Sequence, residues 1–119
     1  LPNFFVAGCT SLTTMTANNA LSVGSNAFNG CTSLTTVNTS IAAAIQDYVF
    51  INCNALTTIN LSSCTDFGGT TGDNNVFFGI TGNTITITVP TALSTCDAGS
   101  PDGDLVWLAA NNTATINYI

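Results

Sequence analysis

A ten-residue pattern recurs at a fixed spacing through the first half of the chain, and its copies begin at positions 6, 28 and 50. Each copy joins an apolar residue, a cysteine, a leucine, a Thr-Thr pair and a final apolar residue, and the copies are Val6–Met15, Phe28–Val37 and Phe50–Ile59. A fixed period of about 22 residues is typical of a solenoid, in which a single unit cannot bury its apolar side without its neighbours. The sequence therefore predicts a stack of coils, and the functional surface is the one that stacking creates.

Composition limits the partners that such a stack can have. The 119 residues fit one domain, and only 5% of them are charged, whereas ordinary domains carry about 25% charged residues. There is no Lys, Arg, His or Glu, and six Asp residues give a net charge of -6. Without a basic residue to neutralise phosphates, no nucleic-acid partner is expected. The longest apolar stretches, such as residues 41–45, are far too short to span a bilayer, so membrane insertion is not expected.

The chain begins at Leu1-Pro2, inside a repeat, with no initiator Met and no signal-peptide pattern. These features predict a mature fragment or a piece of a longer protein. Residues 1–6 would expose apolar side chains at the end of a solenoid. We therefore expect the N-terminal end to stack on further repeats or on another subunit.

Each coil is expected to contain one brief strand, because a Thr-rich run with apolar residues follows each repeated leucine. Side chains alternate along a strand, so Val37 and Ile59 point inward while their neighbours point outward. Stacking in register places Leu12, Leu34 and Leu56 in one column and Met15, Val37 and Ile59 in another. Large aromatic side chains are expected in the core or at its covered end, namely Phe28, Tyr48, Phe50, Phe77 and Trp107.

The fourth unit contains an insertion over residues 66–75, so Phe77 follows Phe50 at a longer spacing than Phe50 follows Phe28. Residues 84–89 then form the clearest alternating strand, with Ile87 aligned with Ile59. Pro90 ends this strand, because proline cannot donate a hydrogen bond to a sheet.

The remaining residues break the repeat. Ser100 before Pro101 predicts the start of a helix, with Ser100 as its N-cap, and a last strand follows over residues 113–119. Terminal units of solenoids differ from the others because they cover the exposed core. The sequence thus predicts a solenoid over residues 1–90, open at its N-terminal end, and a C-terminal cap over residues 91–119.

The pattern Ala27-Phe28-x-x-Cys31-x-x-Leu34-x-x-Val37 resembles the BspA-like leucine-rich repeat family, over about residues 4–89. The first unit departs from the family pattern with Val6 at the aromatic position. The resemblance implies an α/β-type repeat solenoid with short parallel strands. It has about four coils of 22–27 residues and a C-terminal helix-strand cap. Family members are typically surface proteins of bacteria, phages or protists that act in adhesion. The resemblance therefore also implies a location outside the cell, on the cell surface or on a virion.

Cys9, Cys31 and Cys53 share one repeat position, so we expect an inward column of buried, reduced thiols that behave as small apolar groups. Neighbours in such a column lie about 5 Å apart, which allows a disulfide on Cα separation alone. Parallel side chains and an odd number of members argue against one. A bridge between Cys64 and Cys96 remains an open alternative.

Asp97, Asp102 and Asp104 are candidate oxygen ligands for Ca²⁺, the one cofactor that the sequence suggests. They lack the spacing and the Glu of an EF-hand loop, so a solvated loop that caps a helix is the favoured interpretation. No His, Lys or Glu is available as a general acid or base, and no two Asp residues form a pair on one strand face. The protein is therefore predicted not to be an enzyme.

The outward side chains of the predicted strands form an uncharged, hydrogen-bonding surface made of Thr14, Thr16, Thr36, Asn38, Thr58, Asn60, Thr86 and Thr88. Strand propensity and solubility alone would also explain this composition. The functional interpretation is a non-catalytic binding or adhesion surface for a cell-surface protein or glycan. A structural spacer or self-assembling fibre subunit without a ligand is the alternative. Ice binding is a further alternative, although only two of the strands carry Thr at both outward positions.

Overall fold

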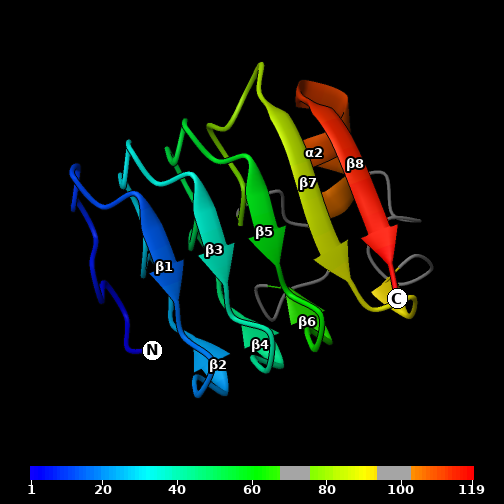
Figure 1. Cartoon of the computed structure of the whole chain (residues 1–119), viewed down its shortest axis with the longest axis horizontal. Helices are drawn as coiled ribbons and strands as arrows, with labels where there is room; N and C mark the ends of the chain where they lie inside the picture. The colour runs from blue at the N-terminus through cyan, green and yellow to red at the C-terminus, as the bar shows by residue number, and fades with distance from the viewer. Residues whose placement is uncertain (68–75, 94–102) are drawn as a thin grey trace.

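A computed structural model describes residues 1–67, 76–93 and 103–119. Five parallel strands form one sheet in the order β1-β3-β5-β7-β8. Their bounds are β1 (Thr14–Thr16), β3 (Thr36–Asn38), β5 (Thr58–Asn60), β7 (Thr84–Val89) and β8 (Thr113–Tyr118). The strands lie side by side from the N-terminal to the C-terminal end of the molecule (Figure 1). The predicted repeat solenoid with short parallel strands is therefore confirmed.

A second sheet runs along another side of the stack. It consists of β2 (Ser22–Val23), β4 (Ala44–Ile45) and β6 (Asp66–Phe67), all parallel. The expectation of one strand per coil was thus incomplete, since the first three coils have two. A two-residue strand carries no periodicity that sequence reasoning could detect.

The predicted column of Met15, Val37 and Ile59 is confirmed by the pairing of the strands. Met15 pairs with Val37, Val37 with Ile59, and Ile59 with Ile87. All but Met15 are buried. The longer spacing in the fourth unit therefore leaves the register of the core intact.

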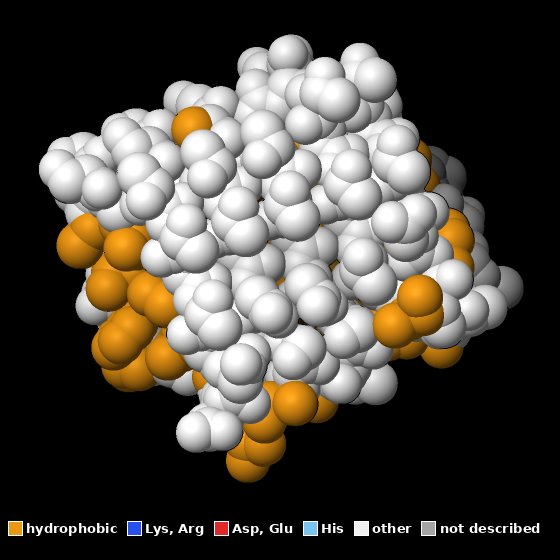
Figure 2. Space-filling view, viewed as in Figure 1, with side chains coloured by type: hydrophobic (Ala, Val, Ile, Leu, Met, Phe, Trp, Pro, Cys, Tyr) orange, Lys and Arg blue, Asp and Glu red, His pale blue; other side chains and the backbone are white. Residues whose placement is uncertain are grey.

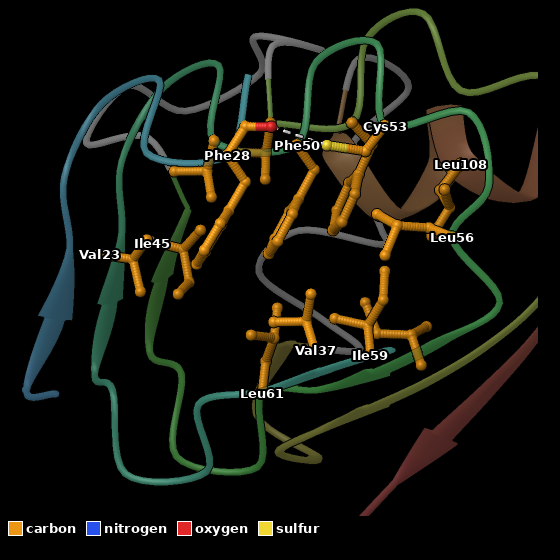
Figure 3. Close-up of a cluster of buried hydrophobic side chains, with 14 of the residues drawn as sticks. Val23, Phe28, Val37, Ile45, Phe50, Cys53, Leu56, Ile59, Leu61 and Leu108 are labelled. Carbon is orange, nitrogen blue, oxygen red and sulfur yellow. Dashed lines mark hydrogen bonds between the residues drawn. The ribbon is translucent and has the colours of Figure 1, made fainter. Parts of the chain in front are cut away.

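The repeated aromatic position builds a stack of rings through the centre of the core (Figure 3). The centroids of Phe28 and Phe50 are 5.6 Å apart with the planes 6° from parallel. Phe50 and Phe77 follow at 5.7 Å and 8°. All three side chains are fully buried, and Phe67 packs edge-on against Phe77. Stacking at this spacing requires the coils to be in register, which the chain achieves despite the insertion.

Two positions per coil adopt the left-handed backbone conformation, and both recur with the repeat. The first position is occupied by Phe4, Asn26 and Tyr48, with φ of 55°, 59° and 62°. The second is occupied by Gly8, Gly30, Asn52 and Gly79, with φ from 60° to 87°. Gly and Asn adopt this conformation readily, whereas an aromatic residue there is strained. The turns are thus dictated by Gly and Asn, and Phe4 and Tyr48 follow the same path against their own preference.

Replacing Gly79 with Ala is expected to lower the free energy of unfolding by about 1–3 kcal/mol, through backbone strain and a clash with Asn52. An added Cβ would contact the Asn52 side-chain oxygen and lie 3.3 Å from the Asn52 backbone nitrogen. Gly82 has the same kind of φ but nothing within 4 Å of such a Cβ, so Gly82→Ala should show the strain alone. Urea unfolding of both variants measures the difference. Equal losses of unfolding free energy in the two variants would contradict the contact, as would a Gly79→Ala loss that adding Asn52→Gly does not reduce.

The C-terminal helix α2 (Asp104–Asn111) and the strand β8 follow the fourth coil. Leu105 and Leu108 of α2 are fully buried and belong to the core. The helix begins later than predicted: Gly103 is its N-cap, without a side-chain capping bond, and Ser100 lies outside the described residues. Asp104 and Leu105, the first two residues of the helix, are both buried.

An asparagine pair fixes α2 and β8 to the fourth coil. Asn83 occupies the position where earlier coils have leucine, and its side chain donates to the carbonyls of Asn54 and Leu56 at 2.7 and 3.2 Å. Its backbone N–H donates to Asn112 Oδ1 at 3.0 Å. Asn112 Nδ2 in turn donates to the Ile80 and Leu108 carbonyls at 2.8 and 3.0 Å. Polar groups at this end of the core are therefore satisfied internally.

Candidate binding surface

The eight outward residues singled out in the sequence lie in two straight columns across the five-stranded sheet. Strand pairing aligns Thr14, Thr36, Thr58 and Thr86 in one column and Thr16, Asn38, Asn60 and Thr88 in the other. Neighbouring strands lie about 4.8 Å apart, so each column repeats at that spacing. We call the surface that both columns form the strand face.

The strand face extends one strand further than the sequence indicated. β8 pairs in parallel with β7, which aligns Thr115 with Thr86 and Asn117 with Thr88. Both side chains are exposed. Sequence reasoning assigned residues 113–119 to the cap, although their alternation of Thr and Asn with apolar residues repeats that of the other strands. That alternation was the signal that could have identified them.

The residues of the strand face differ in how far they are accessible. Thr14, Thr16, Thr58 and Thr86 are exposed, whereas Thr36, Asn38, Asn60 and Thr88 are half-buried. Asn60 Oδ1 accepts a hydrogen bond from the backbone of Ser62 at 3.1 Å. Asn38 Oδ1 is buried and has no partner among the described residues. The threonine column therefore offers more free hydroxyl groups to a ligand than the asparagine column does.

Hydrogen bonds between coils hold the strand face rigid where the chain enters it. The Thr35 hydroxyl donates to the Thr13 carbonyl at 3.0 Å, and the Thr57 hydroxyl donates to the Thr35 carbonyl at 3.2 Å. On the far side of the strands, the Ser62 hydroxyl donates to the Ser40 carbonyl at 3.2 Å. A surface fixed in this way loses little conformational freedom when it binds a partner.

The strand face carries no charged side chain, since both of its columns consist of Thr and Asn alone. Figure 2 shows this side of the molecule as a polar, uncharged expanse, with apolar side chains gathered at the N-terminal end and along the lower rim. A partner would meet hydroxyl groups, amides and the methyl groups of Thr. Such a surface suits an uncharged polar partner rather than an ionic one.

The cysteine column is buried in the second and third coils and open in the first. The Cys31 thiol donates to the Val6 carbonyl at 3.2 Å, and the Cys53 thiol donates to the Phe28 carbonyl at 2.9 Å. Cys9 is exposed, so the expectation of a fully buried column was wrong at its first member. No coil covers Cys9 from the N-terminal side in the structure. Cys64 is buried, and Cys96, its alternative partner, lies outside the described residues.

A thiol reagent at pH 8 is expected to modify Cys9 at least about 100-fold faster than Cys53. Burial, with a smaller contribution from Cys31, raises the pKa of Cys53 to about 12, and burial also raises the pKa of Cys31. On the order of one Cys53 thiol in 10,000 is then ionised at pH 8, and the reagent must wait for a local opening. Peptide mapping by mass spectrometry after short exposures measures each site. Equally fast modification of Cys53 in the folded protein would contradict its burial.

A scan of known families matches residues 2–99 to the BspA type leucine-rich repeat region, described as six copies. The chain belongs to the BspA-type leucine-rich repeat family. Leucine-rich repeat regions are generally non-catalytic modules whose surfaces bind proteins. Comparison of this BspA-type region with curated proteins and with solved structures finds no match. Among the residues that the structure describes, no helix has the length and apolar character needed to cross a bilayer.

The acidic residues of the BspA-type chain do not come together as a metal site in the described part. Asp104 was expected in a solvated loop, but it is buried at the start of α2, and its Oδ1 accepts the backbone N–H of Val76 at 3.1 Å. The other two Ca²⁺ candidates, Asp97 and Asp102, lie outside the described residues. Across residues 1–67, 76–93 and 103–119, no group of three or more acidic residues or cysteines could hold a metal ion. Asp104 therefore has a structural role, which is to join α2 to the fourth coil.

One aromatic residue lies where the sequence did not predict it. Tyr48 was expected in the core but is 40% exposed, because the left-handed turn directs it outward together with Phe4. Phe78 is also exposed, and its ring lies 5.9 Å from that of Trp107. Trp107 is half-buried at the C-terminal end of the core. The aligned Asn26 at the turn position was the signal that could have placed Tyr48 outside.

Proposed function

We propose that the strand face is the binding surface of a non-catalytic adhesion module, which recognises a cell-surface protein or glycan. The observation that carries this proposal is the in-register pair of Thr and Asn columns across five strands. Uncharged hydroxyl and amide groups at a regular spacing match the hydroxyl groups of a glycan or the backbone groups of a protein. The family's general role as a protein-binding module supports the same conclusion.

A location outside the cell, on the cell surface or on a virion, is part of this proposal. The family supports it, because BspA-type proteins are often surface-associated. The proposed unit of function is a solenoid over residues 1–90 covered by residues 91–119. Calcium plays no part in the proposed contact, since the strand face contains no acidic residue.

Binding through the strand face is expected to depend weakly on salt and to be lost in a Thr14→Lys/Thr58→Lys variant. Both residues are exposed and lie in the same column, separated by β3, so the two lysines do not face each other directly. Salt weakens contacts between charges, and the strand face has no charged side chain to make one. The measurement is a glycan array and whole-cell binding, followed by titration of the best target at low and high salt.

The matched control carries the same two added charges away from the strand face, as Ala43→Lys/Ser63→Lys. Both positions are exposed and lie outside the five-stranded sheet. Circular dichroism verifies that both variants are folded. If the control binds like the wild type and the strand-face variant does not, the site is assigned. Full binding by a folded strand-face variant would contradict the proposal.

A structural spacer or fibre subunit without a ligand is the second candidate function. The observation that favours it is that β1 and β8 are both edges of the sheet, which leaves strand edges at the two ends of the stack. Sedimentation over a range of concentrations separates the two functions. A fibre subunit forms long end-to-end assemblies and binds neither glycans nor cells, whereas an adhesion module binds without assembling.

A further inference from the structure

The N-terminal end of the stack leaves the inward side of the first coil uncovered. Its inward residues are exposed or half-buried, while their equivalents one repeat later are buried; the pairs are Leu1 and Val23, Phe5 and Ala27, Val6 and Phe28, Cys9 and Cys31, Leu12 and Leu34, Met15 and Val37. Phe5, for example, is 45% exposed and Ala27 is fully buried. The surface that the second coil buries against the first is therefore present again on the first coil, without a partner.

Backbone hydrogen bonds give the stack a direction at this end. Over residues 3–8, the N–H groups of Phe4, Val6 and Gly8 donate to Ser25, Ala27 and Asn29 of the next coil at 3.0, 2.9 and 2.7 Å. The next coil repeats this arrangement toward the third, with Asn26, Phe28 and Gly30 as donors to Asp47, Val49 and Ile51. Every carbonyl in this series points back toward the preceding coil. The equivalent carbonyls of Asn3, Phe5 and Ala7 therefore face the open end, and an occupant that shields them from water must supply donors.

At one position of the first coil, a proline stands where later coils have a backbone N–H that points toward the preceding coil. The N–H of Gly24 donates to the Leu1 carbonyl at 2.8 Å, and that of Gln46 donates to the Val23 carbonyl at 3.0 Å. Pro2 is the equivalent residue of the first coil and has no N–H. On this side of the open end, the first coil therefore offers no backbone amide N–H to an occupant, and the N-terminal ammonium of Leu1 donates to the Ser22 carbonyl of the next coil.

The sheet side of the open end presents donors instead. Thr35 donates both its N–H and its hydroxyl to the Thr13 carbonyl, at 2.9 and 3.0 Å. Thr13 occupies the equivalent position of the first coil, so its N–H and hydroxyl face outward, as does the thiol of Cys9. An occupant must supply carbonyls here and N–H groups on the opposite side.

We propose that the N-terminal end is a docking face for one further coil of the same repeat, in the same orientation as the coils below it. A coil in that orientation supplies N–H groups to the three carbonyls and carbonyls to Thr13 and Cys9, as the first coil does for the second. No charged side chain occurs in residues 1–46, so docking removes no side-chain charge from water. This face is separate from the strand face and does not depend on its proposed function.

A second copy of the chain fits this face less well in either arrangement. Head-to-head docking by a two-fold axis reverses the sense in which the partner's coil runs, so its N–H groups and inward side chains do not repeat the register that the second coil has on the first. Head-to-tail docking would bring β8 and α2 to the open end. The N–H groups of α2 are used within that helix beyond its first turn, so they are not available to the three carbonyls.

The test places a copy of residues 23–44 directly before Leu1, because residue 23 and residue 1 are equivalent in the repeat. The added coil should slow modification of Cys9 by a thiol reagent at least about tenfold, toward the rate of Cys31. The midpoint of urea unfolding should rise, since the added coil buries the side chains of Phe5, Val6 and Leu12. The matched control adds the residues of the same segment in scrambled order, which keeps composition and length but not register.

Each outcome decides the proposal. Protection of Cys9 by the ordered extension and not by the scrambled one supports it. Equal protection by both, or by neither, overturns it. Sedimentation of the unextended chain tests whether a second copy of the chain occupies the face. Phe4→Lys is the test variant, and Tyr48→Lys, at the equivalent position two coils away, is its control. A dimer of the unextended chain that protects Cys9 and is broken by Phe4→Lys alone would assign the face to a second copy and overturn the proposal.

Discussion

Replacing Phe50 with Ala is expected to lower the free energy of unfolding by about 3–5 kcal/mol. Phe50 is fully buried and its ring is stacked on both sides, against Phe28 and Phe77. The surrounding coils cannot close the resulting cavity, because the Phe28 N–H is bonded to Val49 and the Phe50 N–H to Val76, at 3.1 and 2.9 Å. Small domains have a total stability of about 5–15 kcal/mol, so this variant should be partly unfolded under mild conditions.

Urea unfolding followed by circular dichroism and by the fluorescence of Trp107 measures this effect. Phe4→Ala is the matched control, because Phe4 is 62% exposed and its removal should change stability by less than about 0.5 kcal/mol. Trp107 lies in α2 and reports the C-terminal end, so coincident transitions would show that the stack unfolds as one unit. A loss below about 1 kcal/mol for Phe50→Ala would show that the ring stack is not the centre of the core.

The fixed period explains why so much of the fold could be predicted from the sequence. Once three copies establish the spacing, each inward residue has a known neighbour above and below it, without knowledge of the turns between. The alignment of Ile87 with Ile59 survived the insertion because the alternation in residues 84–89 fixes which side chains point inward. The threonine column followed from the same reasoning.

Features that depend on a single coil or a single contact could not be predicted in this way. Cys9 has the same sequence environment as Cys31, and its exposure results only from its place in the first coil. Asp104 bonds to Val76 and Asn83 to Asn112, through contacts that occur once and leave no periodic signal. The repeat thus determines the interior of the stack, while individual polar contacts determine its C-terminal end.

A chain that ends at Val89 is expected to aggregate instead of remaining a folded monomer. The truncation removes Leu105 and Leu108, both fully buried, and leaves the inward side of the fourth coil exposed to water. It also removes β8, which makes the six-residue strand β7 an open edge. An edge of this length that carries no charge or proline can pair with another molecule. Size-exclusion chromatography with light scattering measures the outcome, with the full chain as reference.

Two further chains separate the exposed edge from the exposed core. Adding Thr84→Lys and Thr86→Lys to the truncated chain places charges on exposed positions of β7, which should hinder edge pairing without covering the core. In the full chain, Asn112→Ala removes the bonds to Asn83, Ile80 and Leu108 but keeps β8 in the sequence. We expect the lysines to reduce aggregation, and Asn112→Ala to lower the free energy of unfolding by about 1–3 kcal/mol without causing aggregation. A truncated chain that stays monomeric and unfolds cooperatively would show that α2 and β8 are not needed to cover the stack. If the lysines leave aggregation unchanged, its cause is contact between uncovered cores. Edge pairing and core contact are the two routes by which stacked coils associate.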